Sequence, residues 1–192
     1  MPRLTVLSPI LLACLILQGC ATPILVAGAA AGVTLANDRR APGTIIDDQD
    51  IEIHLRSAIN DDAALADDTH ISVTSFNHVL LLTGEVRDTQ QRDKVMEHAR
   101  NTQNIKRIHD EIQIAAPISS QDYNQDTWIT TKVKGTLAQQ ADLNALNVKV
   151  VTENSIVYLM GLVTRAEGNI AATATQQVAG VRGVIKVFEY LD

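Results

Sequence analysis

The stretch HISVTSFNHVLLLTG at residues 70–84 is matched in pattern by NVKVVTENSIVYLMG at residues 147–161, position for position and without a gap. In both stretches apolar residues alternate, a polar turn follows, and an apolar run leads to a final glycine. Alternation with a period of two is typical of a half-buried strand. An asparagine at the turn, Asn77 or Asn154, tolerates the positive φ that a tight hairpin needs. We therefore expect a β-hairpin in each stretch, with the glycine ending or bulging its second strand.

The sequence on both sides of the hairpins repeats as well, with the alignment slipping by a single position at the loops. Apolar residues at helical spacing predict one helix before each hairpin, and a second helix and a last strand are expected after it. The expected ranges are 51–59 and 129–137 for the first helix, 89–101 and 166–178 for the second helix, and 108–114 and 184–191 for the strand. Each copy then has the order α-β-β-α-β.

This order predicts an α+β fold of two tandem domains, each with a three-stranded sheet and two helices packed on one face. We place the domains at residues 44–116 and 126–192, joined by a linker at residues 117–125. A domain of about 70 residues is close to the lower limit for independent folding, so we expect the two domains to stabilise each other.

Residues 1–19 have the pattern of a secretory signal peptide, with one positive charge at Arg3 and an apolar run at residues 4–17. The run of about 14 residues is shorter than the roughly 20 needed to cross a bilayer. Its end, Leu-Gln-Gly followed by Cys20, resembles the bacterial lipobox, in which the chain is cleaved before a fatty-acylated cysteine. The alternative is an ordinary signal peptide whose cysteines stay free.

Lipidation of Cys20 anchors a protein in a membrane through acyl chains such as palmitate. The mature chain then holds no second cysteine and no internal disulfide. Ala21 is not the aspartate that retains lipoproteins in the inner membrane, so the resemblance implies the periplasmic face of the outer membrane. Residues 20–43 are expected to be the lipidated cysteine and a flexible tether.

Composition and motifs argue against a nucleic-acid binder and against an enzyme. The net charge of −6 is opposite in sign to the basic excess of duplex-binding proteins. No nucleophile motif, phosphate-binding loop or CxxC pair occurs, so we expect no cofactor, no metal and no small-molecule substrate.

The histidines all lie in the first copy without the spacing of a helical metal site, and we interpret them as solvent-exposed side chains. They are His54, His70, His78, His98 and His109. The alternative is that they reduce the negative charge of the first copy at mildly acidic pH.

The two copies differ in charge and in one aromatic residue. Residues 44–116 hold 14 acidic and 7 basic residues, whereas residues 127–192 hold 5 acidic and 6 basic residues. The only tryptophan, Trp128, lies beside two lysines in the first helix of the second copy, where the first copy has Asp50. An indole next to ammonium groups suits the headgroup zone of an anionic bilayer. The alternative is that Trp128 packs between the domains or covers a core edge.

Two segments, DTWITTKVK at residues 126–134 and VVTENSIVYLMGLVT at residues 150–164, resemble the helix and hairpin of the BON domain. With the lipobox and the tether, the whole chain is similar to the dual-BON-domain outer-membrane lipoproteins of bacteria. This resemblance implies binding of anionic phospholipid, a role in outer-membrane integrity and enrichment at the division site. The candidate phospholipid-binding residues are Trp128, Thr131, Lys132, Lys134 and Gly135.

Two other functions stay open. One is a protein–protein adaptor whose helix with Trp128 docks onto an envelope assembly machine. The other is a hydrolase whose site has no recognisable motif. Exposure of Trp128 to solvent is the observation that separates a surface site from a packing role.

Overall fold

The computed structural model describes residues 38–65, 69–116 and 120–192, and residues 39–192 form one compact unit. The first domain contains α3 (Pro42–Asp61), β1 (His70–Phe76), β2 (Val79–Val86), α4 (Thr89–Asn101) and β3 (Arg107–Ile114). The second contains α5 (Ser120–Ala138), the short 3₁₀ helix η1 (Ala145–Asn147), β4 (Val148–Glu153), β5 (Ile156–Val163), α6 (Arg165–Gln176) and β6 (Gly183–Tyr190). The order α-β-β-α-β occurs twice, so the predicted α+β fold is confirmed.

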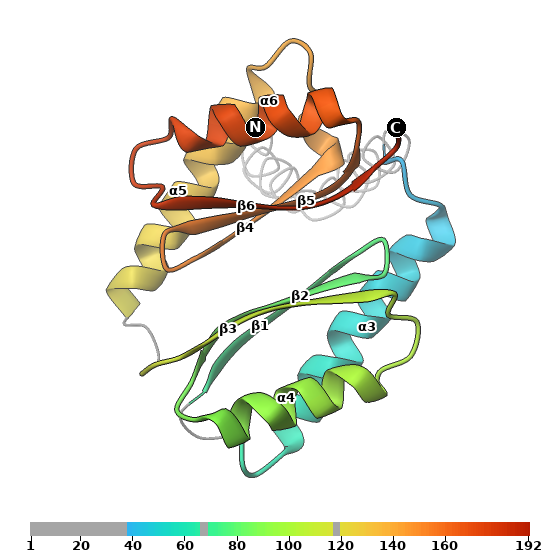
Figure 1. Cartoon of the computed structure of the whole chain (residues 1–192), viewed down its shortest axis with the longest axis vertical. Helices are drawn as coiled ribbons and strands as arrows, with labels where there is room; N and C mark the ends of the chain where they lie inside the picture. The colour runs from blue at the N-terminus through green and yellow to red at the C-terminus, as the bar shows by residue number, and fades with distance from the viewer. Residues whose placement is uncertain (1–37, 66–68, 117–119) are drawn as a thin grey trace, which may run out of the picture. The chain divides into compact units, whose positions relative to one another are not determined.

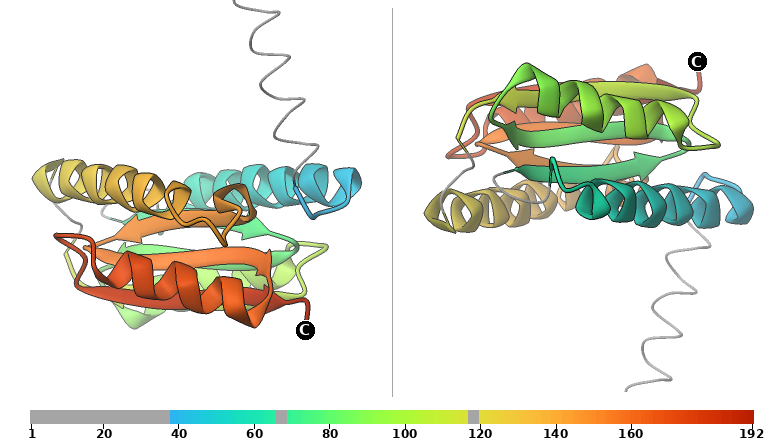
Figure 2. Two further views of the ribbon diagram at one scale, coloured as in Figure 1. Left: turned by 90° about the horizontal axis from the view of Figure 1, so that it is seen from above. Right: turned by 90° about the horizontal axis from the view of Figure 1, so that it is seen from below.

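The two sheets share one topology. In each, the middle strand, β2 or β5, pairs antiparallel with the strand before it and parallel with the last strand of its domain. Two helices cover one face of each sheet, α3 and α4 in the first domain and α5 and α6 in the second (Figure 1). Figure 2 shows α4 lying over the sheet of the first domain and α6 over that of the second, each running roughly along the strands.

Both hairpins turn through two residues in the left-handed region, as the asparagines predict. Asn77 and His78 have φ values of 53° and 64°, and Asn154 and Ser155 have values of 49° and 62°. Positive φ at both central residues is the geometry of the two-residue turn whose twist matches that of the strands. The hairpin prediction is therefore confirmed in both domains.

The prediction that a glycine ends or bulges the second strand is wrong. β2 and β5 each continue two residues beyond it, and the pairing register runs through Gly84 and Gly161 without a shift. A Cβ at Gly84, where φ is +111°, would lie 1.8 Å from the carbonyl oxygen of His70, and one at Gly161 would lie 2.3 Å from that of Asn147. The glycines therefore permit a close approach of the neighbouring backbone.

Two helices begin earlier than expected. α3 starts at Pro42, so residues 42–43, which we had assigned to the tether, are helical. Proline suits the first position of a helix because its missing N–H would have no partner there. α5 starts at Ser120, so residues 120–125 of the expected linker form its first turns.

The faces of the sheets that the helices leave open pack against each other. The apolar residues of this contact come from β1 and β2 in the first domain and from β5 and β6 in the second; they are Phe76, Val79, Leu81, Tyr158, Met160 and Val187. Each is at most 6% exposed. The two domains therefore support each other through a shared apolar layer, which stabilises domains of this size.

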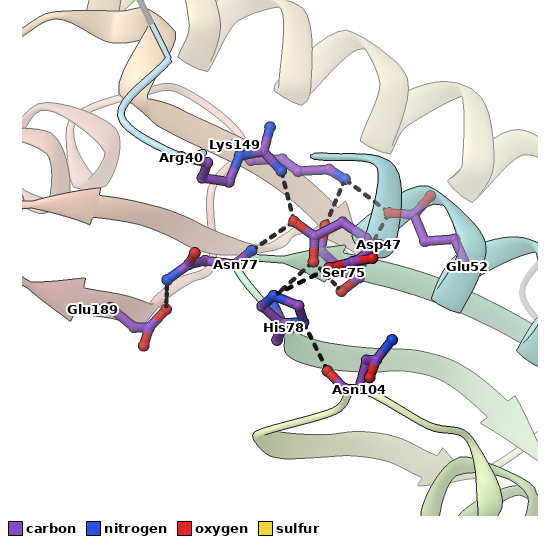
Figure 3. A network of polar contacts seen from close by, with 10 residues as sticks. Arg40, Asp47, Glu52, Ser75, Asn77, His78, Asn104, Lys149 and Glu189 are labelled. Carbon is purple, nitrogen blue, oxygen red and sulfur yellow. Dashed lines mark hydrogen bonds and ion pairs between the residues drawn. The ribbon is translucent and has the colours of Figure 1, made fainter. Parts of the chain in front are cut away.

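Polar contacts surround this apolar layer. The ammonium group of Lys149 donates to Glu52 Oε1 at 2.9 Å and to the carbonyl oxygen of Ser75 at 3.2 Å, and Asn77 Nδ2 donates to Glu189 Oε2 at 2.7 Å (Figure 3). Each of these hydrogen bonds joins a residue of one domain to a residue of the other.

A buried aspartate in the first helix of each domain holds the hairpin turn. The carboxylate of Asp48 accepts hydrogen bonds from the backbone N–H groups of Asn77 and His78, at 2.7 and 2.8 Å. Asp126 accepts the equivalent bonds from Asn154 and Ser155, also at 2.7 and 2.8 Å. Such bonds satisfy turn N–H groups that have no partner in the sheet.

Candidate functional site

The candidate site residues lie on α5. This helix packs Ile129, Val133 and Leu137 into the core of the second domain, each at most 1% exposed. Trp128 lies about 100° around the helix from Ile129, because successive helical residues are separated by that angle. Trp128 follows this geometry, with 63% of its surface exposed.

The exposure of Trp128 excludes the alternative in which it packs between the domains or covers a core edge. Residues of the apolar layer between the sheets are at most 6% exposed, and Trp128 does not belong to it. Ile53 is exposed to a similar degree, at 60%, so what distinguishes Trp128 is an exposed indole next to an ammonium group.

Lys132 supports the indole from one side. Its Nζ atom lies 5.9 Å from the centroid of the Trp128 ring and donates a hydrogen bond to the carbonyl oxygen of Ala179, just beyond α6. A cation at this distance from an indole ring is attracted by the π electrons. Lys132 is only partly exposed, and it contacts both the indole and the turn after α6.

The other candidate residues are exposed along the same helix. Lys134 is exposed and forms no hydrogen bond or ion pair with any residue that the structure describes. Thr131 is exposed and donates its hydroxyl hydrogen to the carbonyl oxygen of Thr127 at 3.0 Å. A Cβ at Gly135 would contact nothing within 4 Å. α5 therefore exposes Thr131, Lys134 and Gly135 as well as Trp128.

The first domain presents a different surface on the equivalent helix. Asp50 stands where the second domain has Trp128, and its carbonyl oxygen contacts His54 Nδ1 at 2.9 Å. Arg56, aligned with Lys134, donates to the carbonyl oxygen of Val73 at 3.2 Å and lies 3.8 Å from Glu52. The combination of an indole and a free lysine is thus confined, among the described helices, to α5.

A cleft of about 370 Å³ lies beside α5 of the second domain. Residues of α5, β1 and β4 line it: His70, Ser72, Asp126, Thr127, Thr130, Thr131, Lys134, Thr152 and Glu153. Burial raises the pKa of Glu153 to about 7, and the nearby carboxylates of Glu85 and Asp126 act in the same direction while His70 opposes them. The cleft therefore contains the hydroxyl groups of its threonines, the ammonium group of Lys134 and the carboxyl group of Glu153, which resists ionisation.

The interpretation of the histidines as solvent-exposed side chains is correct only for His54. His78 Nδ1 lies 2.8 Å from the carbonyl oxygen of Asn104, and His98 Nε2 lies 3.0 Å from Asp62 Oδ2. His109 Nε2 is buried without a hydrogen bond to any described residue, and burial lowers the pKa of its imidazole. His70 faces two buried carboxylates.

The chain enters the described region beside the second domain. Arg39 donates two hydrogen bonds to the carboxylate of Glu167, at 2.7 and 2.8 Å, and a third to the carbonyl oxygen of Leu162 at 3.1 Å. The Arg39 hydrogen bonds lower the pKa of Glu167 to about 2. Two parallel bonds between a guanidinium and a carboxylate fix both groups more firmly than a single contact does.

The expected signal peptide, Cys20 and residues 21–37 of the expected tether lie outside the described residues. Within residues 38–65, 69–116 and 120–192, each helix is too short or too polar to span a bilayer.

Comparison with known proteins supports the resemblance on which the candidate site rests. A sequence model of the BON domain matches residues 47–116 and 125–192. The chain belongs to the BON-domain family. This BON-domain protein is 34% identical over 186 residues to outer membrane lipoprotein DolP of Haemophilus influenzae, over 97% of this chain and 96% of that protein.

Two further relatives are more distant. The 21 kDa hemolysin of Actinobacillus pleuropneumoniae is 32% identical over 81% of this BON-domain chain and 80% of its own length. Osmotically-inducible protein Y of Escherichia coli is 26% identical over 80% of this chain and 78% of its own length.

Sequence reasoning missed the two aspartates that hold the turns and the acidic residues at the domain interface. Asp48 and Asp126 occupy equivalent positions in the two copies, so the repeat itself carried a signal for them. Glu85 and Glu153 have no acidic counterparts in the other copy, and they approach each other only because the sheets face each other.

Proposed function

We propose that this BON-domain protein is a non-catalytic, lipid-anchored protein of the outer membrane whose second domain binds anionic phospholipid through α5. The observation that carries the proposal is the exposure of Trp128 beside Lys132, on a helix that also exposes Lys134. An indole of this kind inserts at the level of the lipid headgroups, and ammonium groups attract the phosphates.

Anchoring at Cys20 makes a weak headgroup site effective. The 34% identity to a protein named outer membrane lipoprotein supports both the anchor and the outer membrane as its location. Nineteen residue steps separate Cys20 from Arg39, so the chain between them reaches at most about 65 Å. A second contact with the same membrane is then intramolecular, and its effective concentration is high.

We further propose a role in outer-membrane integrity and enrichment at the division site, where a site selective for anionic lipid would concentrate the protein. The acidic first domain, which has no counterpart of Trp128, serves as a support for the second domain rather than as a membrane contact. Its net charge of −7 disfavours approach to an anionic surface.

Vesicle flotation of residues 38–192, which lack the anchor, tests this proposal. We expect binding to vesicles containing phosphatidylglycerol, no binding to pure phosphatidylcholine, and a decrease as salt rises, because screening weakens attraction to phosphates. Lys134→Glu should lower the affinity at least about fivefold, since one lysine near an anionic surface contributes about 1 kcal/mol and the new carboxylate adds repulsion.

The matched control is Lys106→Glu, which makes the same charge change at an exposed position of the first domain. Equal loss in both variants would mean that net charge alone attracts the protein. Absence of binding to every vesicle would favour the adaptor, in which α5 docks onto a protein.

A further inference from the structure

His70, Glu85 and Glu153 meet where the two domains touch. His70 and Glu85 are paired neighbours on β1 and β2 of the first domain, and Glu153 ends β4 of the second. His70 Nδ1 lies 3.5 Å from Glu85 Oε2 and 3.7 Å from Glu153 Oε1, and one atom from each of the three residues lies within 4.8 Å of the others.

These separations are too long for hydrogen bonds and suit ligands of one metal ion. Direct hydrogen bonds from a ring nitrogen to a carboxylate are about 2.7–3.2 Å long. Two ligand atoms on a tetrahedral zinc ion, each about 2.1 Å from the metal, are roughly 3.4 Å apart. The distances from the imidazole nitrogen to the two carboxylate oxygens, 3.5 and 3.7 Å, are close to that spacing.

Burial of the two carboxyl groups favours a bound cation at this cluster. Glu85 is 2% exposed and Glu153 is 8% exposed. His70 Nδ1 is a buried atom that forms no hydrogen bond with any described residue. Glu153 Oε2 accepts a hydrogen bond from Thr83 Oγ1 at 3.3 Å, and a bound divalent ion would offset the charge of both buried carboxylates when they are ionised.

The cluster is also accessible to ions from one side. His70 and Glu153 both line the cleft of about 370 Å³, so an ion in the cleft comes up to two of the three residues. One imidazole and two carboxylates form a donor set that suits Zn²⁺ among the divalent metals, with water from the cleft as the fourth ligand.

We infer that His70, Glu85 and Glu153 form a divalent metal site, with Zn²⁺ as the favoured ion, that links the two BON domains. This inference departs from the expectation of no metal, which rested on the absence of a helical spacing pattern. The ligands come from three strands and two domains, so no local pattern in the sequence indicates the site.

Titration calorimetry with ZnCl₂ on the full-length protein, purified in detergent without a histidine tag, tests the site. We expect one Zn²⁺ per chain, with affinity reduced at least about tenfold in His70→Gln and Glu153→Gln, because each variant removes a ligand. Zn²⁺ should raise the unfolding midpoint of the wild type more than that of either variant.

His54→Gln is the matched control, because His54 is exposed and outside the cluster; it should bind Zn²⁺ like the wild type. Wild-type protein without stoichiometric binding, or cluster variants that bind as well as the wild type, would overturn the inference. Zinc-edge X-ray absorption on the wild type identifies the ligands of the bound ion and needs no variant. One imidazole with oxygen ligands supports the site, and two or more imidazoles contradict it.

Discussion

Trp128→Glu is expected to reduce the affinity of residues 38–192 for phosphatidylglycerol vesicles by at least about 30-fold. Transfer of the exposed part of an indole from water into the bilayer interface contributes roughly 2 kcal/mol, and each 1.4 kcal/mol is a factor of ten in affinity. A glutamate at the same place adds repulsion from the lipid phosphates. Flotation across a range of lipid concentrations measures the change.

Two variants separate this effect from a general loss of apolar surface. Trp128→Phe should keep part of the binding, because the ring remains. Ile53→Glu replaces an exposed apolar residue, 60% exposed, on α3 of the first domain and should leave binding unchanged. An equal loss in Ile53→Glu would show that the membrane contact is not confined to α5.

Asp48→Ala is expected to lower the free energy of unfolding by about 4 kcal/mol. The buried carboxylate accepts hydrogen bonds from Ser75 Oγ at 2.7 Å and from Arg40 at 2.8 Å, besides the two turn N–H groups. Its removal leaves several donors without an acceptor, and each such buried group costs about 1–3 kcal/mol. Urea unfolding followed by circular dichroism measures the change.

Asp50→Ala is the matched control for this variant. Asp50 lies on the same helix but is exposed, so its replacement should change the stability by less than about 0.5 kcal/mol. If Asp48→Ala behaved like Asp50→Ala, the buried carboxylate would not be needed to hold the hairpin turn.

Local patterns predicted the parts of the fold that depend on local physics. The turn asparagines led to both hairpins, and the helix at residues 89–101 was placed at its observed bounds. The exposure of Trp128 follows from its position next to Ile129, a residue of the helical core pattern. These features depend on backbone preference and on helical periodicity, both of which a single sequence contains.

The packing of one sheet on the other was not predicted, although the sequence contained a trace of it. The run Val79–Leu82 has no alternation, and all four of its residues are buried. A continuous apolar run is typical of a strand covered on both faces. We expected helices on one face only, so the second cover, which comes from the other domain, was missed.

The cluster of His70, Glu85 and Glu153 could not be predicted from the sequence at all. Glu153 belongs to the second domain and His70 to the first, and the two meet only through the contact between domains. Sequence periodicity shows which face of a single helix or strand is buried, but it does not show which faces of different elements meet.

The bounds of α3 and α5 were missed because their first turns contain few apolar residues to mark a helix.

Intrinsic fluorescence tests the central claim most directly, because Trp128 is the only tryptophan of the chain. Addition of phosphatidylglycerol vesicles to the wild-type protein should shift its emission to shorter wavelength and protect it from acrylamide quenching, whereas phosphatidylcholine vesicles should do neither. An unchanged emission from protein that is bound to the anionic vesicles would place the membrane contact elsewhere and contradict the account.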